Sequence, residues 1–328
     1  MNSRLNDRNA LAAVHADLKS GLSLPVRLMS RRKLTAKSVR RTRWIDGVVQ
    51  RIVGRGTPSR RIPGRAGAPD VRLWVLDCRT HKATQPTPAV LHIHGGGYIG
   101  SSAAFMFKTL RQLSSELDCL VVSVDYRLAP ETPYPGSLED NYAALAWLHA
   151  NANALGIDPA RIAVMGESAG GGHAAALAIA ARDRGEYPLA FQVLIYPMLD
   201  DRTGSTRMPA SPDVGRFIWT APSNVLGWSS LLGVPAGGAF APAGAVPARV
   251  EDLSGLAPAW IGVGSLDLFH DEDVAYAERL QAAGVPTVLE QVDGAYHGFD
   301  ILLRDAPVSK AFTHSWMSAL SGAFAPSR

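Results

Sequence analysis

The sequence predicts an α/β fold with a mostly parallel sheet of about eight strands, and two observations support this. Short apolar, β-branched runs recur after residue 70, and most of them are separated by amphipathic stretches of helical length. Short buried strands that alternate with helices are typical of βαβ units. A chain of 328 residues with 47% hydrophobic side chains is also long enough to bury a large core without disulfides.

The elements can be placed in order along the chain. Strands are expected at residues 71–78, 89–94, 120–125, 162–165, 191–196, 260–263 and 287–292. Helices are expected at 102–117, 138–150, 169–184, 271–283 and 308–324. The first of these strands follows a turn region rich in Pro and Gly, so it could open the sheet as an antiparallel strand.

Two regions interrupt this alternation. One is the basic N-terminal segment, and the other is a stretch at 200–250 that is rich in Pro, Gly, Ser and Ala. A stretch this long between two strands is either a disordered loop or a helical insertion, and its aromatic residues Phe217, Trp219 and Trp228 favour one that packs. We expect both regions to form a helical cap over one end of the sheet, and these three aromatic residues to contribute to the pocket. The expected division is a cap segment at 1–60, a cap insertion at 200–250, and a core at 61–199 and 251–328.

The formal net charge of +4 hides a marked asymmetry. Residues 1–65 contain 16 Lys and Arg against 3 Asp and Glu, whereas the rest of the chain has 17 basic and 26 acidic side chains. Such a segment is either a nucleic-acid or membrane-binding arm or a basic part of the fold that packs on an acidic body. Interspersed apolar residues such as Leu11, Leu18 and Trp44 favour packing, and no basic–aromatic nucleic-acid module is present. We therefore expect no nucleic-acid partner.

The composition also indicates the cellular compartment in which the protein is expected. No apolar run approaches the roughly 18 residues that span a bilayer, and the N-terminus lacks the apolar core of a secretory signal. Cys78 and Cys119 are too few for a disulfide framework or a metal-binding quartet. The sequence therefore predicts a cytoplasmic protein without membrane insertion.

The clearest chemical signal is the motif Gly166-Glu167-Ser168-Ala169-Gly170, which has the pattern G-x-S-x-G. It directly follows the strand expected at 162–165 and leads into the helix expected at 169–184. In this context the serine lies on a tight, strained turn, and a Cβ at either glycine would clash with the neighbouring strand or helix. The helix N-terminus adds a positive dipole beside the serine oxygen. Ser168 is therefore the candidate nucleophile.

A second motif, His94-Gly95-Gly96-Gly97, ends the strand expected at 89–94. Consecutive glycines allow backbone N–H groups to point into a site, as the oxyanion of an ester-cleaving enzyme requires. Gly95, Gly97 and Gly100 also match the dinucleotide-binding pattern G-x-G-x-x-G. No suitable ribose-binding acid follows, and Ser168 lies downstream, so the oxyanion interpretation is preferred.

A nucleophilic serine needs a base and an acid, which in this order of elements follow it in loops after later strands. His297 lies in a glycine-flanked loop after the strand expected at 287–292, and it is the predicted base; His314 lies inside a helix instead. Asp267 follows the strand expected at 260–263 and is the predicted acid, with Asp271 as the alternative. The acids at 271–273 lie in the first turn of an expected helix, where we expect them to cap the helix or to face solvent. His270 has no cluster of further ligands, so no metal is expected.

These motifs together resemble the hormone-sensitive-lipase-like branch of the α/β-hydrolase-fold carboxylesterases. The resemblance covers residues 70–325 and also includes the stretch Asp125-Tyr126-Arg127-Leu128-Ala129-Pro130-Glu131. It implies a triad of Ser168, Asp267 and His297, and an oxyanion hole formed by the backbone of Gly96, Gly97 and Ala169. It also implies a cap, and a homodimer as a candidate assembly. Arg127 is expected to pair with Glu131 or Asp140. Glu167 and Tyr98 depart from the common family residues and are expected to shape the pocket.

The expected activity is that of a serine carboxylesterase that hydrolyses short- to medium-chain acyl esters through an acyl-enzyme. A small-molecule ester is the expected partner, and no metal or organic cofactor is needed. An amidase, an arylformamidase or a lactonase would use the same groups on other carbonyls. A small-molecule receptor on the same fold typically lacks the serine or the base, and this chain has both.

Overall fold

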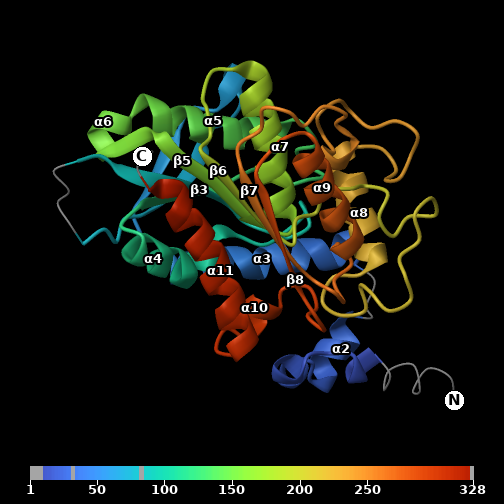
Figure 1. The fold of residues 1–328 in the computed structure, drawn as a ribbon. Helices are drawn as coiled ribbons and strands as arrows, with labels where there is room; N and C mark the ends of the chain where they lie inside the picture. Colours follow the sequence, from blue (N-terminus) through green and yellow to red (C-terminus); the bar gives the residue numbers. More distant parts are fainter. Residues whose placement is uncertain (1–9, 31–33, 81–84, 326–328) are drawn as a thin grey trace, which may run out of the picture.

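One eight-stranded sheet organises the computed structural model, which describes residues 10–30, 34–80 and 85–325. The strand order is β1-β2-β4-β3-β5-β6-β7-β8, and β3 to β8 run parallel to one another (Figure 1). Strands β1 and β2 join this sheet antiparallel, β2 on β4 and β1 on β2. The predicted fold class is confirmed, and so is the antiparallel entry of the strand expected at 71–78.

The element bounds follow the chain. The strands are β1 (Ser59–Ile62), β2 (Val71–Leu76), β3 (Thr87–Ile93), β4 (Leu120–Asp125), β5 (Ile157–Glu167), β6 (Phe191–Ile195), β7 (Ala259–Gly264) and β8 (Thr287–Val292). The α-helices are α2 (Leu24–Ser30), α3 (Ala36–Val53), α4 (Phe107–Glu116), α5 (Gly136–Ala150), α6 (Ala152–Leu155), α7 (Ala169–Arg184), α8 (Ala221–Leu232), α9 (His270–Ala282), α10 (Phe299–Leu302) and α11 (Pro307–Phe324). The short 3-10 helices are η1 (Ala16–Gly21), η2 (Arg65–Gly67), η3 (Ala103–Met106) and η4 (Pro247–Arg249).

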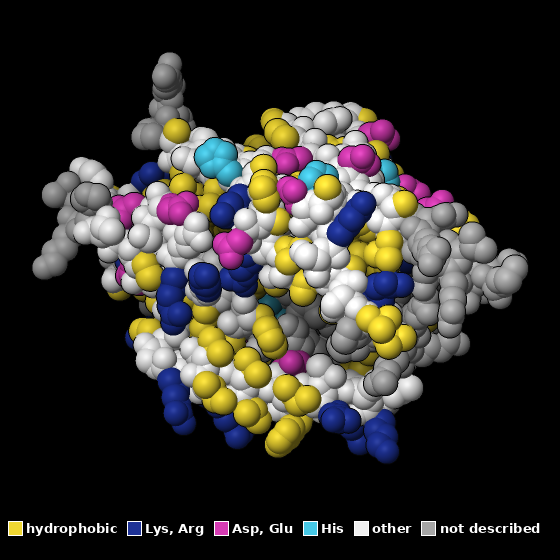
Figure 2. All heavy atoms as spheres, turned by 90° about the horizontal axis from the view of Figure 1, so that it is seen from below, with side chains coloured by type: hydrophobic (Ala, Val, Ile, Leu, Met, Phe, Trp, Pro, Cys, Tyr) yellow, Lys and Arg dark blue, Asp and Glu magenta, His cyan; other side chains and the backbone are white. Residues whose placement is uncertain are grey.

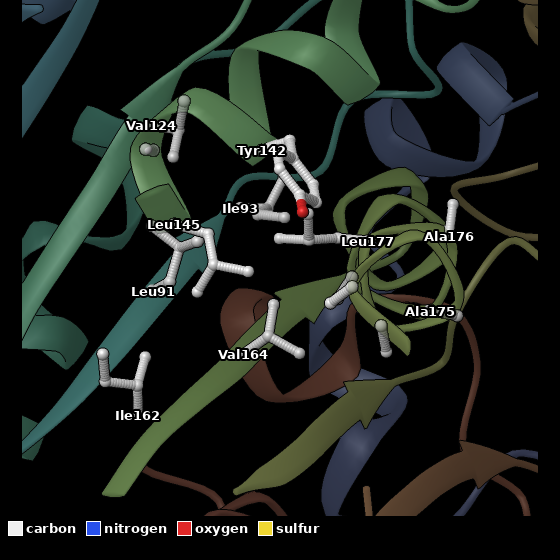
Figure 3. Close-up of a cluster of buried hydrophobic side chains, with 14 of the residues drawn as sticks. Leu91, Ile93, Val124, Tyr142, Leu145, Ile162, Val164, Ala175, Ala176 and Leu177 are labelled. Atoms are coloured by element: carbon white, nitrogen blue, oxygen red, sulfur yellow. The ribbon is translucent and has the colours of Figure 1, made fainter. Parts of the chain in front are cut away.

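The alternation of side chains along the buried strands builds two core layers. Leu91 and Ile93 of β3 and Val164 of β5 lie on the face that α5 and α7 cover (Figure 3). The intervening residues Val90 and Met165 point to the opposite face, where they pack with α4 and α11. A period of two puts successive side chains on opposite faces, and because both faces are buried, these strands are apolar throughout.

The two regions that interrupt the alternation of strands and helices pack on the sheet and its helices, as far as these regions are described. Leu18 of η1 is fully buried in the core layer of α4 and α11. In the insertion, α8 buries Trp228 and Leu231 in a third cluster with Tyr98, which follows β3. The described parts of the basic segment, residues 10–30 and 34–65, thus belong to the folded body and do not form a free arm.

The structure also differs from the predicted elements. Strand β1 was not predicted, because its residues are polar and mostly exposed and so lack an apolar pattern. The helix expected at 102–117 divides into η3 and α4. Strand β5 begins at Ile157, earlier than expected. The prediction missed this start because residues 158–161 are partly or fully exposed and form no apolar run. In the described part of the chain, no helix has both the length and the apolarity to cross a membrane.

Candidate active site

The candidate site lies where four parallel strands end. The glycine loop follows β3, Ser168 follows β5, Asp267 follows β7 and His297 follows β8. The carboxyl ends of parallel strands meet at one edge of a sheet, which is where open α/β folds bind their ligands. Residues up to 203 positions apart in sequence therefore converge at this edge.

Ser168 occupies a strained turn between β5 and α7. Its φ of +56° lies in the left-handed region, which is unusual for a residue with a side chain. A Cβ at Gly166 would lie 2.3 Å from the Gly170 carbonyl oxygen, and one at Gly170 would lie 2.0 Å from the Ile93 oxygen. Both glycines of the motif are thus required by close backbone approach, as the sequence predicts.

The three residues of the predicted triad form one hydrogen-bonded chain. The Nε2 atom of His297 is 2.9 Å from the Oγ of Ser168. Its Nδ1 atom is 2.8 Å from Oδ2 of Asp267. The Asp267 carboxylate is fully buried and accepts the Phe269 N–H with its other oxygen at 3.1 Å. A buried carboxylate in this position fixes the ring orientation and selects the tautomer with a free Nε2 toward the serine.

Aromatic rings hold the imidazole in place. Tyr196 and Phe269 pack on it edge-to-face, with ring centroids 4.9 and 5.2 Å from that of His297. The Tyr196 hydroxyl donates to Asp300 at 2.8 Å, and burial raises the pKa of Asp300 to about 6. The sequence did not point to Tyr196, which directly follows β6 and belongs to no motif.

The loop after β3 presents backbone donors beside Ser168. Gly96 and Gly97 have φ of +121° and +61°, and a Cβ at Gly97 would overlap the Trp219 ring. Within the described residues, no backbone or side-chain acceptor bonds the N–H of Gly96 or Gly97. Ala169, the first residue of α7, is buried next to Ser168. This arrangement can supply hydrogen bonds to an oxyanion.

A pocket of about 310 Å³ adjoins these donors. Gly96 and Trp219 line it, together with Val39 and Thr42 of α3. Its walls are largely apolar, with the Asp46 carboxylate among them. Of the three aromatic residues expected at the pocket, Trp219 is there, whereas Trp228 is buried in the third cluster and Phe217 packs on Tyr296.

Comparisons with known proteins agree with this geometry. A family model described as the alpha/beta hydrolase fold matches residues 90–301. The chain is 35% identical over 272 residues to Esterase LipI of Mycobacterium tuberculosis, covering 79% of each chain.

The chain belongs to the α/β-hydrolase family.

Further matches place this family member among esterases. It is 34% identical over 236 residues to the ethyl acetate hydrolase of Pseudomonas putida, covering 68% of this chain and 71% of that one. The solved structure titled "Bacterial Heroin Esterase" superposes with a TM-score of 0.83 at 32% identity, covering 96% of this chain and 99% of that one. The predicted resemblance to hormone-sensitive-lipase-like esterases is confirmed, and so is the prediction of a carboxylic ester hydrolase.

Two residues of α3 that belong to no sequence motif hold the loop after β3. Asp46 accepts the backbone N–H of Ser101 at 2.9 Å, and burial raises the pKa of its carboxyl group. One turn earlier, Arg43 donates to the Ile99 carbonyl at 2.6 Å and to Glu131 at 2.6 Å. A single acid in a basic helix gives no sequence signal for such a contact.

Several other interpretations are corrected by the structure. Glu167 does not shape the pocket, because it is buried behind Ser168 with its carboxylate 3.0 Å from His92. Tyr98 does not either: its hydroxyl donates to the Met198 carbonyl within the core. The expected pairing of Arg127 is confirmed for one of its two candidate partners, Asp140, at 2.7 Å.

The acids at the start of α9 are not a solvated group. Glu272 and Asp273 are buried, and Glu272 accepts the N–H groups of Leu199 and Asp200 at 2.6 and 3.1 Å. Burial raises the pKa of both carboxyl groups well above the ordinary range. Only Asp271 is exposed, where it contacts His270. None of these acids reaches the imidazole of His297, whose Nδ1 is paired with Asp267.

Proposed function

We propose that this protein is a serine carboxylesterase in which Ser168 is the nucleophile, His297 the base and Asp267 the acid. The observation that carries the proposal is the chain of two hydrogen bonds, 2.9 Å from serine to histidine and 2.8 Å from histidine to aspartate. Both bonds are within the distance that proton transfer requires in the ground state. The aspartate is buried, so it can stabilise the imidazolium that forms.

The reaction proceeds in two halves. Ser168 Oγ attacks the ester carbonyl, and its proton passes to His297 Nε2. The N–H groups of Gly96, Gly97 and Ala169 hold the oxyanion, and a single such donor is worth about 3 kcal/mol. Protonated His297 then gives its proton to the leaving alcohol, and the acyl group stays on Ser168. Water then attacks the acyl-enzyme as His297 takes one of its protons. His297 returns this proton to Ser168 Oγ as the bond between Oγ and the acyl carbon breaks, which releases the carboxylic acid and restores the serine.

The pocket supports short- to medium-chain acyl groups as substrates. Its volume of about 310 Å³ lies at the small end of ligand pockets, which typically measure about 300–1,000 Å³. The relative named as an ethyl acetate hydrolase supports the same size class. We assign the cap to the described parts of residues 1–60 and to residues 200–250, because residues of α3 and Trp219 line this pocket. Residues 1–9 and 31–33, which the sequence also assigns to the cap, lie outside the described residues.

A p-nitrophenyl acyl series from acetate to palmitate tests the proposal. The wild type is expected to hydrolyse short esters fastest, and Ser168→Ala to hydrolyse none. Turnover of p-nitroacetanilide beside p-nitrophenyl acetate distinguishes the ester from the amide activity. Full hydrolysis by Ser168→Ala would exclude this serine as the nucleophile. Faster cleavage of the anilide than of the ester would identify an amidase.

A further inference from the structure

The outer face of α3 combines exposed apolar side chains with arginines. The exposed fractions are 72% for Trp44, 45% for Ile45 and 60% for Ile52. The same helix and the turn after it expose Lys37, Arg40, Arg41, Arg51 and Arg55. The one acid in α3, Asp46, is buried and bonded to Ser101. We call Arg40, Arg41, Trp44, Ile45, Arg51 and Ile52 the α3 patch.

Helical spacing explains why these residues stay exposed. Residues three or four positions apart share a helix face, so Arg41, Ile45 and Ile52 lie on one side. The opposite side carries Arg43 and Asp46, which bond to the loop after β3. The core-facing side of α3 is therefore satisfied by hydrogen bonds, and its apolar outer side is left to solvent. A basic helix face with Trp and Ile is typical of a membrane-surface helix.

The helix that carries the patch also forms part of the pocket wall. Val39 and Thr42 of α3 line the pocket together with Phe105, which is 43% exposed. Figure 2 views the molecule from below and shows hydrophobic side chains gathered beside a hollow. Lys and Arg side chains lie along the lower edge of this face. The α3 patch and part of the pocket wall therefore belong to one helix.

We propose that the α3 patch docks this protein on the surface of an anionic lipid bilayer, without spanning it. The arginines pair with phosphate headgroups, and Trp44 and Ile52 enter the boundary between headgroups and acyl chains. The mouth of the pocket then faces the lipid, where apolar esters concentrate. This inference goes beyond the proposed function, because docking needs none of the triad residues.

The charge of the α3 patch favours an anionic bilayer over a second copy of the chain as its partner. A two-fold contact places the same surface on both sides, so the arginines of one patch would lie against those of the other. Like charges in close contact oppose association, whereas anionic headgroups complement them. Ile45 and Ile52 find apolar surroundings in lipid that nucleic acid does not offer.

Sedimentation of the full chain with vesicles tests the proposal. The vesicles contain phosphatidylcholine alone, or phosphatidylcholine mixed with phosphatidylglycerol. The wild type is expected to bind the mixed vesicles and to be released as salt rises, because salt screens charges beyond about 10 Å at 0.1 M. Each basic residue near an anionic surface contributes about fivefold to binding, so Arg41→Gln with Arg51→Gln is expected to weaken it about 25-fold.

Two further variants complete the design. Trp44→Ser is expected to weaken vesicle binding while leaving p-nitrophenyl acetate hydrolysis in vesicle-free buffer unchanged. Arg207→Gln, an exposed arginine between β6 and α8, is the matched control and is expected to bind like the wild type.

Equal binding to both kinds of vesicle, or unchanged binding by the double Arg variant, would overturn the proposal. So would a dimer in gel filtration that the double variant dissociates, since this would assign the patch to a second copy. Hydrolysis without vesicles is measured separately, so a failure of docking is distinguishable from a failure of the esterase assignment.

Discussion

Replacement of Asp267 by Asn tests the assignment of the triad acid in detail. Its Oδ2 lies 2.8 Å from His297 Nδ1 and is buried. In the proposed mechanism the carboxylate therefore faces the imidazolium that forms as Ser168 loses its proton. Two unit charges about 4 Å apart attract by about 4 kcal/mol at an effective dielectric constant of about 20. At about 1.4 kcal/mol per tenfold, loss of the charge alone slows the reaction about a thousandfold. An amide also favours the wrong tautomer, which brings the expected loss in kcat to about 10⁴.

The assay is hydrolysis of p-nitrophenyl acetate by purified Asp267→Asn and Asp271→Asn. Asp271 was the alternative acid, and its side chain is 85% exposed, so its variant is expected to keep activity within about twofold. The Asn at position 267 can still accept the Phe269 N–H, so the melting temperature should change little. Retention of a tenth or more of the activity by Asp267→Asn, or a larger loss in Asp271→Asn, would refute the reasoning.

Three further predictions concern the structure around the triad. Asp46→Ala leaves the partly buried Ser101 N–H without its acceptor, at a cost of about 1 kcal/mol. The kcat is expected to fall at least about tenfold and to recover in Asp46→Asn, because the amide oxygen still accepts. Little change in kcat for the Ala variant would contradict the support of the oxyanion loop by α3. Gly170→Ala places a Cβ 2.0 Å from the Ile93 oxygen and is expected to lower the free energy of unfolding in urea by about 3 kcal/mol, whereas Gly322→Ala, which has open space, should not lower it. Burial raises the pKa of Asp300 from 3.8 to about 6. Between these two pH values the folded protein holds a proton on Asp300 that the unfolded chain releases, so the free energy of unfolding should fall by roughly 3 kcal/mol as pH rises from about 3.8 to about 6. Urea titrations at several pH values should show this decrease in the wild type and lose it in Asp300→Asn.

The sequence contained enough information to predict the parallel sheet and the serine, acid and histidine that follow its strands. Buried strands are marked by continuous apolar runs, and a serine, an acid and a histidine that each follow such a run must meet at the same sheet edge. This logic located Ser168, Asp267 and His297, which the structure brings together. The flanking glycines of Ser168 were informative for the same reason, because close backbone packing leaves no room for a Cβ.

Contacts between distant, irregular segments could not be predicted in this way. Nothing in the α3 sequence indicates that Asp46 reaches Ser101, since the contact depends on how the helix is docked. Glu272 and Asp273 have the pattern of an exposed helix start, and they are buried because the chain after β6 packs over them. In each case tertiary packing, which is not encoded in local periodicity, determines the environment of the side chain.

Covalent labelling of the nucleophile tests the central claim most directly. The wild type and Ser168→Ala would each be treated with a fluorophosphonate, and the adduct would be located by peptide mass spectrometry. The account predicts one phosphonyl group on Ser168 of the wild type, with loss of esterase activity in proportion to labelling, and no adduct on the variant. A label on another residue that abolishes activity, or full activity of a wild type labelled at Ser168, would contradict it.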